Sequence, residues 1–134
     1  MRYVVLDTDV SSQSFRDRLP APLVARLAGM YPCISFVTLA ELTKWVEVRH
    51  WGPPNRARMD RWLSGVGYVP HKPEVSRTWG RLAAAAQRRG RPRPMNDMWI
   101  AATCITEGLP LATLNVKDFE DFATYDGLQL IPHN

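Results

Sequence analysis

The sequence contains no long hydrophobic run. Apolar segments such as YVVL and CISFV are short, whereas a membrane-spanning helix needs about 20 consecutive apolar residues. The opening residues, MRYVVLDTDV, also lack the apolar stretch and the small-residue cleavage site of a secretory signal peptide. We therefore expect a cytoplasmic protein without membrane contact.

Cysteine and histidine are scarce. The 134 residues include two cysteines and three histidines, and Cys33 and Cys104 stand far apart among apolar neighbours. Neither cysteine has the closely spaced companion of a zinc motif, and a reducing compartment does not favour disulfides. Both cysteines are therefore predicted to be small core residues, and zinc is not expected.

Positive charge exceeds negative charge. Seventeen Lys and Arg stand against 13 Asp and Glu, which gives a net charge of +4, and 14 of the 17 are arginines. The guanidinium group suits phosphate recognition. Four arginines lie in RRGRPRP: Arg88, Arg89, Arg91 and Arg93. They are candidates for binding nucleic-acid phosphates, and the alternative is a set of cations at a helix carboxyl terminus followed by a solvated loop.

Apolar strands alternate with helices along the chain. Strands are expected at residues 3–6, 33–37 and 109–114, with short extended segments at 67–70 and 128–132. Helices are expected at residues 22–29, 38–50, 53–65, 74–90 and 94–104, with a helical turn at 117–122. This alternation is typical of a parallel sheet covered on both faces. We expect one domain over residues 1–134, with an α/β fold of three layers (α/β/α) around a mainly parallel sheet.

Acidic and amide side chains follow the expected strands or open the expected helices. Asp7 follows the first strand, Asn115 and Asp118 follow the strand at 109–114, and Glu41 and Asp97 lie in first turns of helices. The carboxyl ends of parallel strands and the amino ends of the following helices share one edge of the sheet, where ligands bind. These side chains are therefore expected to converge.

Asp97 shares its helix face with apolar residues. In PMNDMWIAATC it precedes Ile100, Ala101 and Cys104 by three, four and seven residues, so its carboxylate belongs to a face expected to be buried. A buried charge needs a partner. Several carboxylates held together repel one another unless they are protonated or bridged by a cation, and oxygen ligands favour a hard ion such as Mg²⁺ or Mn²⁺.

Helix capping is the alternative role for each of these groups. Thr38 and Glu41 have the spacing of a capping box, and Asn96 or Asn115 could cap the helices that follow them, with Asp97 and Asp118 as first-turn acids. Capping explains each position separately. It does not explain why several segments bring acids to one edge of a sheet.

The motifs together resemble those of the PIN domain, and within it the VapC-type toxin ribonucleases. VLDTDV is similar to the family's first motif, SFVTLAEL to its second, NDMWIAA to its third and LATLNVKDFE to its fourth. By this resemblance Asp7, Glu41 and Asp97 correspond to the family's metal-binding acids. Asn115 stands where many relatives have a fourth acid, which leaves open whether Asp118 completes the site.

The resemblance implies a metal-dependent endoribonuclease that hydrolyses RNA with Mg²⁺, for which Mn²⁺ substitutes. Asp7, Asp97, Asn115 and Asp118 are the expected metal ligands, and the expected catalytic residues are Asp7, Glu41, Asp97 and Asp118. Thr8 and Thr38 match small polar residues that accompany these acids, and together with the four arginines of RRGRPRP they are the expected substrate contacts.

The resemblance also implies protein partners, namely a cognate antitoxin and a second copy of the chain in a homodimer. Three of the five tryptophans lie between residues 45 and 62, where they form core or line an apolar groove that accepts a partner helix.

Two other functions are open from the sequence. Asp7 and Asp9 form a D-x-D pair like that of haloacid dehalogenase-like phosphatases, although no later acid pair with a glycine matches their metal motif. A non-catalytic PIN-like module that binds nucleic acid or protein is the third possibility, and Asn115 in place of an acid favours it.

Overall fold

The computed structural model describes residues 2–132. At its centre, four parallel strands form a sheet in the order β3-β2-β1-β4. The strands are β1 (Tyr3–Leu6), β2 (Tyr31–Ser35), β3 (Gly67–Val69) and β4 (Leu111–Ala112). Because β1 lies between β2 and β4, the residue that follows β1 stands near the middle of the sheet edge.

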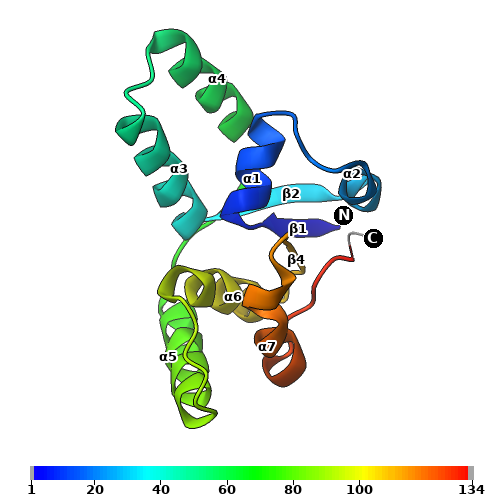
Figure 1. Cartoon of the computed structure of the whole chain (residues 1–134), viewed down its shortest axis with the longest axis vertical. Coiled ribbons are helices and arrows are strands. Elements are labelled where there is room, and N and C mark those ends of the chain that lie inside the picture. Colours follow the sequence, from blue (N-terminus) through cyan, green and yellow to red (C-terminus); the bar gives the residue numbers. More distant parts are fainter. Residues whose placement is uncertain (1, 133–134) are drawn as a thin grey trace.

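Seven helices are found in the described part of the chain. They are α1 (Thr8–Phe15), α2 (Ala21–Leu27), α3 (Phe36–Val48), α4 (Pro53–Ser64), α5 (Pro73–Arg88), α6 (Met95–Glu107) and α7 (Val116–Asp126). Figure 1 shows α1, α3 and α4 on one side of the sheet and α5, α6 and α7 on the other. The expected three-layer α/β/α fold is therefore confirmed.

The alternation of side chains along β1 builds a core on each face of the sheet. Val4 and Leu6 pack with Val10 and Leu23 from the first helices. Val5 points to the opposite face, where it joins a larger cluster formed chiefly by α5, α6 and α7. The period of two in a strand explains why YVVL is apolar throughout, since both of its faces are buried.

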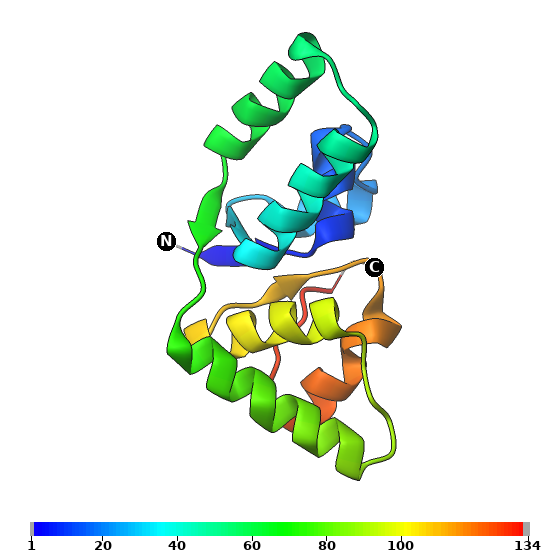
Figure 2. The ribbon, with the colours of Figure 1, turned by 90° about the vertical axis from the view of Figure 1, so that its left-hand side faces the viewer.

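The α3–α4 pair extends away from the sheet, as the side view shows (Figure 2). A third core cluster joins it to the end of α1 through Phe15, Leu42, Val46 and Met59. The tryptophans at residues 45, 51 and 62 pack against this cluster, so the aromatic side chains of this region contribute to a core.

Several expectations about the elements were wrong. The second strand ends at Ser35, and Phe36 and Val37 already belong to α3, because the Ser35 hydroxyl accepts a hydrogen bond from the backbone N–H of Thr38 and caps the helix. The capping box formed by Thr38 and Glu41 is therefore absent, and Glu41 lies in the second turn of α3.

The segment at 128–132 is not a strand, since it contributes one isolated bridge between Leu130 and Leu111. The helix after β4 runs to Asp126 instead of making one turn. The helix α1 was not expected, because TDVSSQSF lacks apolar periodicity. None of the helices in residues 2–132 is long and apolar enough to cross a membrane.

Candidate active site

Asp7 joins β1 to α1. Its backbone is extended, and its Oδ1 accepts a hydrogen bond of 2.8 Å from the Val10 N–H, so the residue caps α1. The side chain is nearly inaccessible, with 3% of its surface exposed. Burial raises the pKa of Asp7 to about 6, with smaller contributions from the charges of Asp9 and Asp97, although hydrogen bonds from Thr113 and Val10 oppose the shift. Capping alone would not produce this environment.

Glu41 is held by side chains from two other helices. The Thr8 hydroxyl donates to its Oε1 at 2.6 Å, and the Asn96 amide donates to its Oε2 at 3.3 Å. The Thr8 and Thr38 hydroxyls lie 3.0 Å apart and share a further hydrogen bond. Residues of α1, α3 and α6 thereby fix the direction of the Glu41 carboxylate. Asn96 is not a helix cap, because α6 begins at Met95 and Pro94 occupies the cap position.

Asp97 lies in the first turn of α6 and is half-buried. Burial raises its pKa to about 6, and the charges of Asp118 and Glu41 add to this effect, while Arg93 opposes it. The Asp97 carboxylate, at the start of an apolar helix face, is therefore close to the acids Asp118 and Glu41. Its burial and its acidic neighbours both favour neutralisation by a proton or a cation.

Asn115 and Asp118 lie at the start of α7. Asn115 occupies the cap position, but its side chain makes no capping hydrogen bond. Its backbone N–H donates to the Thr113 hydroxyl at 2.9 Å. The side-chain amide, which is not used for capping, belongs to the lining of the cavity described below. Asp118 is in the first turn of α7, close enough to Asp97 to raise its pKa.

These groups meet at one cavity of about 420 Å³. Its lining includes Asp7, Thr8, Glu41, Asp97 and Asn115. Thr38 reaches the site through its hydrogen bond with Thr8, whereas Asp118 borders a neighbouring hollow together with Asn115. The convergence expected from the strand and helix ends is therefore present, with Asp118 at its margin.

The donor set fits a hard divalent cation. Asp7 and Asp97 present carboxylate oxygens to the same cavity and raise each other's energy when both are charged, and a cation would relieve that repulsion. Over residues 2–132, no three His, Cys, Asp or Glu side chains stand close enough to hold an ion among themselves. The oxygen-bearing side chains that line the cavity and fit such an ion are therefore the carboxylates of Asp7 and Asp97 and the amide of Asn115.

The four arginines of RRGRPRP do not line the cavity. Arg91 Nε lies 2.9 Å and Arg93 Nη1 3.8 Å from Asp121 Oδ2, and Arg89 Nη2 lies 3.7 Å from Asp126 Oδ2. The Arg89 guanidinium also stands 4.3 Å from the centre of the Tyr125 ring. Three of the four are thus paired with α7, and Arg88 is exposed at the end of α5. Phosphate binding by this loop would require those pairs to open.

The cavity also contains residues outside the expected site, namely Ser12, Arg16, Trp45 and Arg49. Asp9, which the sequence offered only as part of a phosphatase-like D-x-D pair, lines it too. Ser12 and Arg16 lie one and two turns beyond Thr8 on α1, and Trp45 and Arg49 follow Glu41 at the same spacing on α3. The four-residue spacing that places them on one face was the signal that could have found them.

The fold and the site together define an α/β/α protein with a parallel sheet and with acids gathered at the carboxyl end of β1. The family model for the PIN domain matches residues 4–125. The chain belongs to the PIN-domain family.

Its relatives within the family are VapC proteins. The tRNA(fMet)-specific endonuclease VapC of Shigella flexneri is 31% identical over 118 residues, which cover 87% of this chain and 89% of that protein. Among solved structures, VapBC2 from Rickettsia felis bound to a promoter DNA fragment aligns with a TM-score of 0.81 at 23% identity and covers 96% of both chains. VapBC-5 from Mycobacterium tuberculosis, a member of the VapBC toxin-antitoxin family, aligns with a TM-score of 0.71 at 27% identity and covers 98% of both.

Proposed function

We propose that this protein is a metal-dependent endoribonuclease and the toxin of a toxin-antitoxin pair. The observation that carries the proposal is the meeting of Asp7, Glu41 and Asp97, from three separate segments, at one cavity. The raised pKa values of Asp7 and Asp97 support a cation at that place. The naming of the VapC relatives as ribonucleases and endonucleases supports RNA as the substrate.

Asp7 and Asp97 would hold Mg²⁺ or Mn²⁺, and Asn115 would contribute its amide oxygen. A bound divalent cation would neutralise charge on the scissile phosphate and lower the pKa of the attacking water. Glu41 orients that water and accepts its proton, because Thr8 and Asn96 fix the carboxylate from both sides. The water oxygen bonds to phosphorus, the bond from phosphorus to O3′ breaks, and the 3′ oxygen takes up a proton.

The alternative functions are less well supported. The D-x-D pair of Asp7 and Asp9 belongs to a PIN domain, so a dehalogenase-like phosphatase has no support beyond that pair. A binding module without catalysis would not need two carboxylates whose pKa values are raised at a shared cavity.

The experiment that tests the proposal incubates the purified chain with labelled single-stranded RNA in Mn²⁺, in Mg²⁺ and in EDTA, with p-nitrophenyl phosphate in parallel. We expect internal cleavage of RNA in either metal, none in EDTA, and no release of nitrophenol. Hydrolysis of the monoester alone would establish the phosphatase, and inactivity towards both substrates would establish the binding module.

We also propose an antitoxin partner, a homodimer and a cytoplasmic location. The likeness to VapBC-5, a toxin-antitoxin complex at 27% identity, supports the antitoxin. Size-exclusion chromatography with light scattering measures the oligomeric state of the isolated chain, and 30 kDa is about the mass expected for two copies of a 15.2 kDa chain.

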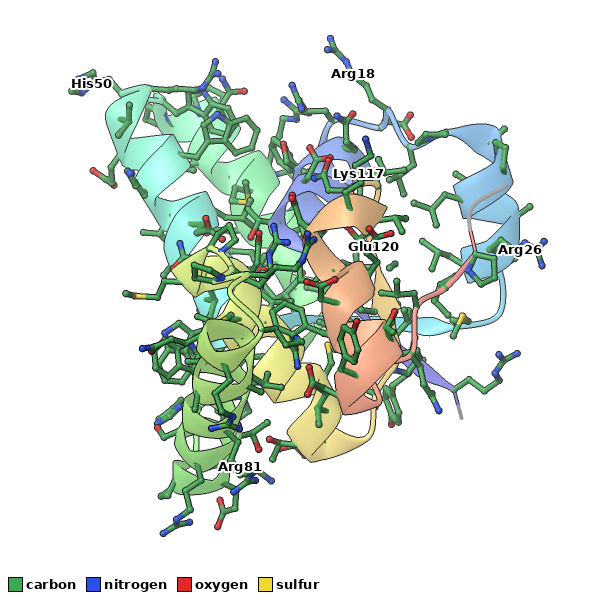
Figure 3. All side chains as sticks on the ribbon, turned by 60° about the horizontal axis from the view of Figure 1, so that its bottom comes forward. Arg18, Arg26, His50, Arg81, Lys117 and Glu120 are labelled. Atoms are coloured by element: carbon green, nitrogen blue, oxygen red, sulfur yellow. The ribbon has the colours of Figure 1, made fainter. Side chains whose placement is uncertain are left out.

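Asp118→Asn should slow cleavage at limiting Mn²⁺ and recover most of its rate at high Mn²⁺. Asp118 borders the neighbouring hollow from the first turn of α7 and acts on Asp97 through its charge, so its loss should weaken recruitment of an ion more than the chemistry. The measurement is the cleavage rate against Mn²⁺ concentration. Glu120→Gln is the matched control, since Glu120 is exposed on the same helix (Figure 3). A wild-type curve would make Asp118 only a helix acid, and inactivity at every concentration would make it a direct ligand.

A further inference from the structure

Several arginines of this chain differ in the groups that they contact. Arg56, Arg89, Arg91 and Arg93 form ion pairs with carboxylates. Arg16 and Arg49 instead lie against an aromatic ring: their guanidinium carbons are 5.7 Å and 5.5 Å from the centre of the Trp45 ring. A carboxylate neutralises a guanidinium and occupies its N–H groups, whereas an aromatic face positions it and leaves its charge and donors free.

Arg16 and Arg49 are also the two arginines that line the acidic cavity. They occupy corresponding positions, because Arg16 ends α1 and Arg49 ends α3. Within residues 2–132 neither of them forms an ion pair. The cavity thus has acids at one end and two unneutralised guanidinium groups at the other.

The spacing of residues along α3 separates the acids of the cavity from its guanidinium groups. Glu41, Trp45 and Arg49 are separated by four residues each and therefore share a face. Each step corresponds to about 6 Å of helix rise. Guanidinium groups at the level of Trp45 are thus displaced along α3 from Glu41, which favours contact with a phosphate that flanks the scissile one.

We propose that Arg16 and Arg49, positioned by Trp45, bind a phosphate next to the scissile bond in an unpaired RNA strand. The inference rests on the proposed ribonuclease function and adds its phosphate-binding residues and the strandedness of its substrate. The cavity of about 420 Å³ has the size of a small-molecule pocket. A cavity of this size is suited to a single nucleotide that has left its stack, in keeping with the general recognition of RNA at single-stranded loops.

The test measures binding of a fluorescein-labelled single-stranded RNA of mixed sequence in EDTA, where cleavage is not expected, at several salt concentrations. Each phosphate contact contributes about 0.7 to the logarithmic salt slope on single strands. Because Arg16 and Arg49 bind the same phosphate, the double variant Arg16→Ala/Arg49→Ala should lower the slope by about 0.7, and each single variant should lower it by part of that amount. Lysine at either position should restore the slope, because it still neutralises a phosphate.

Two matched controls separate this site from general positive charge. Arg58 lies 5.0 Å from the centre of the Phe15 ring but does not line the cavity, and the side chain of Arg18 extends away from the body of the protein (Figure 3). Arg58→Ala and Arg18→Ala should keep the parental slope. All four arginines are on the surface or at its margin, and equal melting temperatures will show that the variants fold.

The outcomes distinguish this inference from the proposed function. A wild-type slope in the double variant, or equal losses in the two controls, overturns the inference even if the chain cleaves RNA in Mn²⁺. An equal loss of slope on a duplex of the same sequence overturns the assignment to an unpaired strand. If only the Arg16 and Arg49 variants lower the slope and the chain cleaves no RNA, the phosphate-binding site is supported and the proposed ribonuclease function is wrong.

Discussion

RNA cleavage in Mn²⁺ should fall at least about a hundredfold in Asp97→Asn, because loss of a group that merely orients a metal ligand already costs 10- to 100-fold. The metal-free variant should melt at the wild-type temperature or above it. Asparagine preserves the shape of the side chain and removes a charge that burial, Asp118 and Glu41 all disfavour. The measurements are cleavage rates and thermal melting with and without Mn²⁺.

Asp126→Asn is the control for this substitution. Asp126 is also partly buried with a raised pKa caused first by burial, but it lies at the end of α7 and outside the cavity. It should leave cleavage and the Mn²⁺-induced rise in melting temperature unchanged. If Asp97→Asn unfolds the protein while its Mn²⁺ response persists, Asp97 serves the helix and not the metal.

Lowering the pH from 7.5 to 4 should stabilise the metal-free protein through Asp7. Its pKa in the folded protein is about 6, against an ordinary value of 3.8, so the folded state binds the proton more tightly than the unfolded state does. The stabilisation is complete below about pH 4 and is lost as the pH rises through 6. For a side chain this deeply buried the full difference is about 3 kcal/mol.

The effect is isolated by comparison with Asp7→Asn, which cannot ionise and keeps an oxygen for the Val10 N–H. Metal-free Asp7→Asn should exceed wild type in free energy of unfolding at pH 7.5, and the two should converge near pH 4. Denaturation in urea at each pH measures the difference. With Mn²⁺ the order at pH 7.5 should reverse, because only wild type gains from the ion. If the difference in free energy of unfolding between the two proteins stays constant from pH 7.5 to 4, ionisation of Asp7 does not destabilise the metal-free protein.

The sheet and its acidic edge could be predicted because both follow from short-range patterns. The strand at residues 3–6 is bounded as expected, since an apolar run ending at an aspartate has few other interpretations. The boundary between β2 and α3 could not be predicted in the same way. CISFV is apolar across the junction, and only the geometry of Ser35 shows that the helix has begun before Thr38.

The roles of the arginines could not be read from their sequence clustering. RRGRPRP is the densest basic segment, yet its neutralising partners Asp121 and Asp126 lie about 30 residues further along, on a helix expected to be a single turn. Arg16 and Arg49 lie 33 residues apart in sequence and meet at Trp45 because α1 and α3 pack side by side. A contact between two helices that are far apart in sequence cannot be predicted from a local sequence pattern.

The position of β4 has a consequence for the time at which the chain becomes active during its synthesis. β4 is the last strand to leave the ribosome, yet it pairs with β1, the first, through Val5–Leu111 and Leu6–Ala112, and the Asp7 N–H donates to the Ala112 carbonyl. Until that pairing forms, the Asp7 N–H lacks its hydrogen bond to Ala112, and Asn115 has not yet been brought to the cavity. A nascent chain that has exposed Asp7, Glu41 and even Asp97 therefore still lacks the assembled site. On the proposed function, it would spare the RNA around it until β4 has been made and has paired with β1.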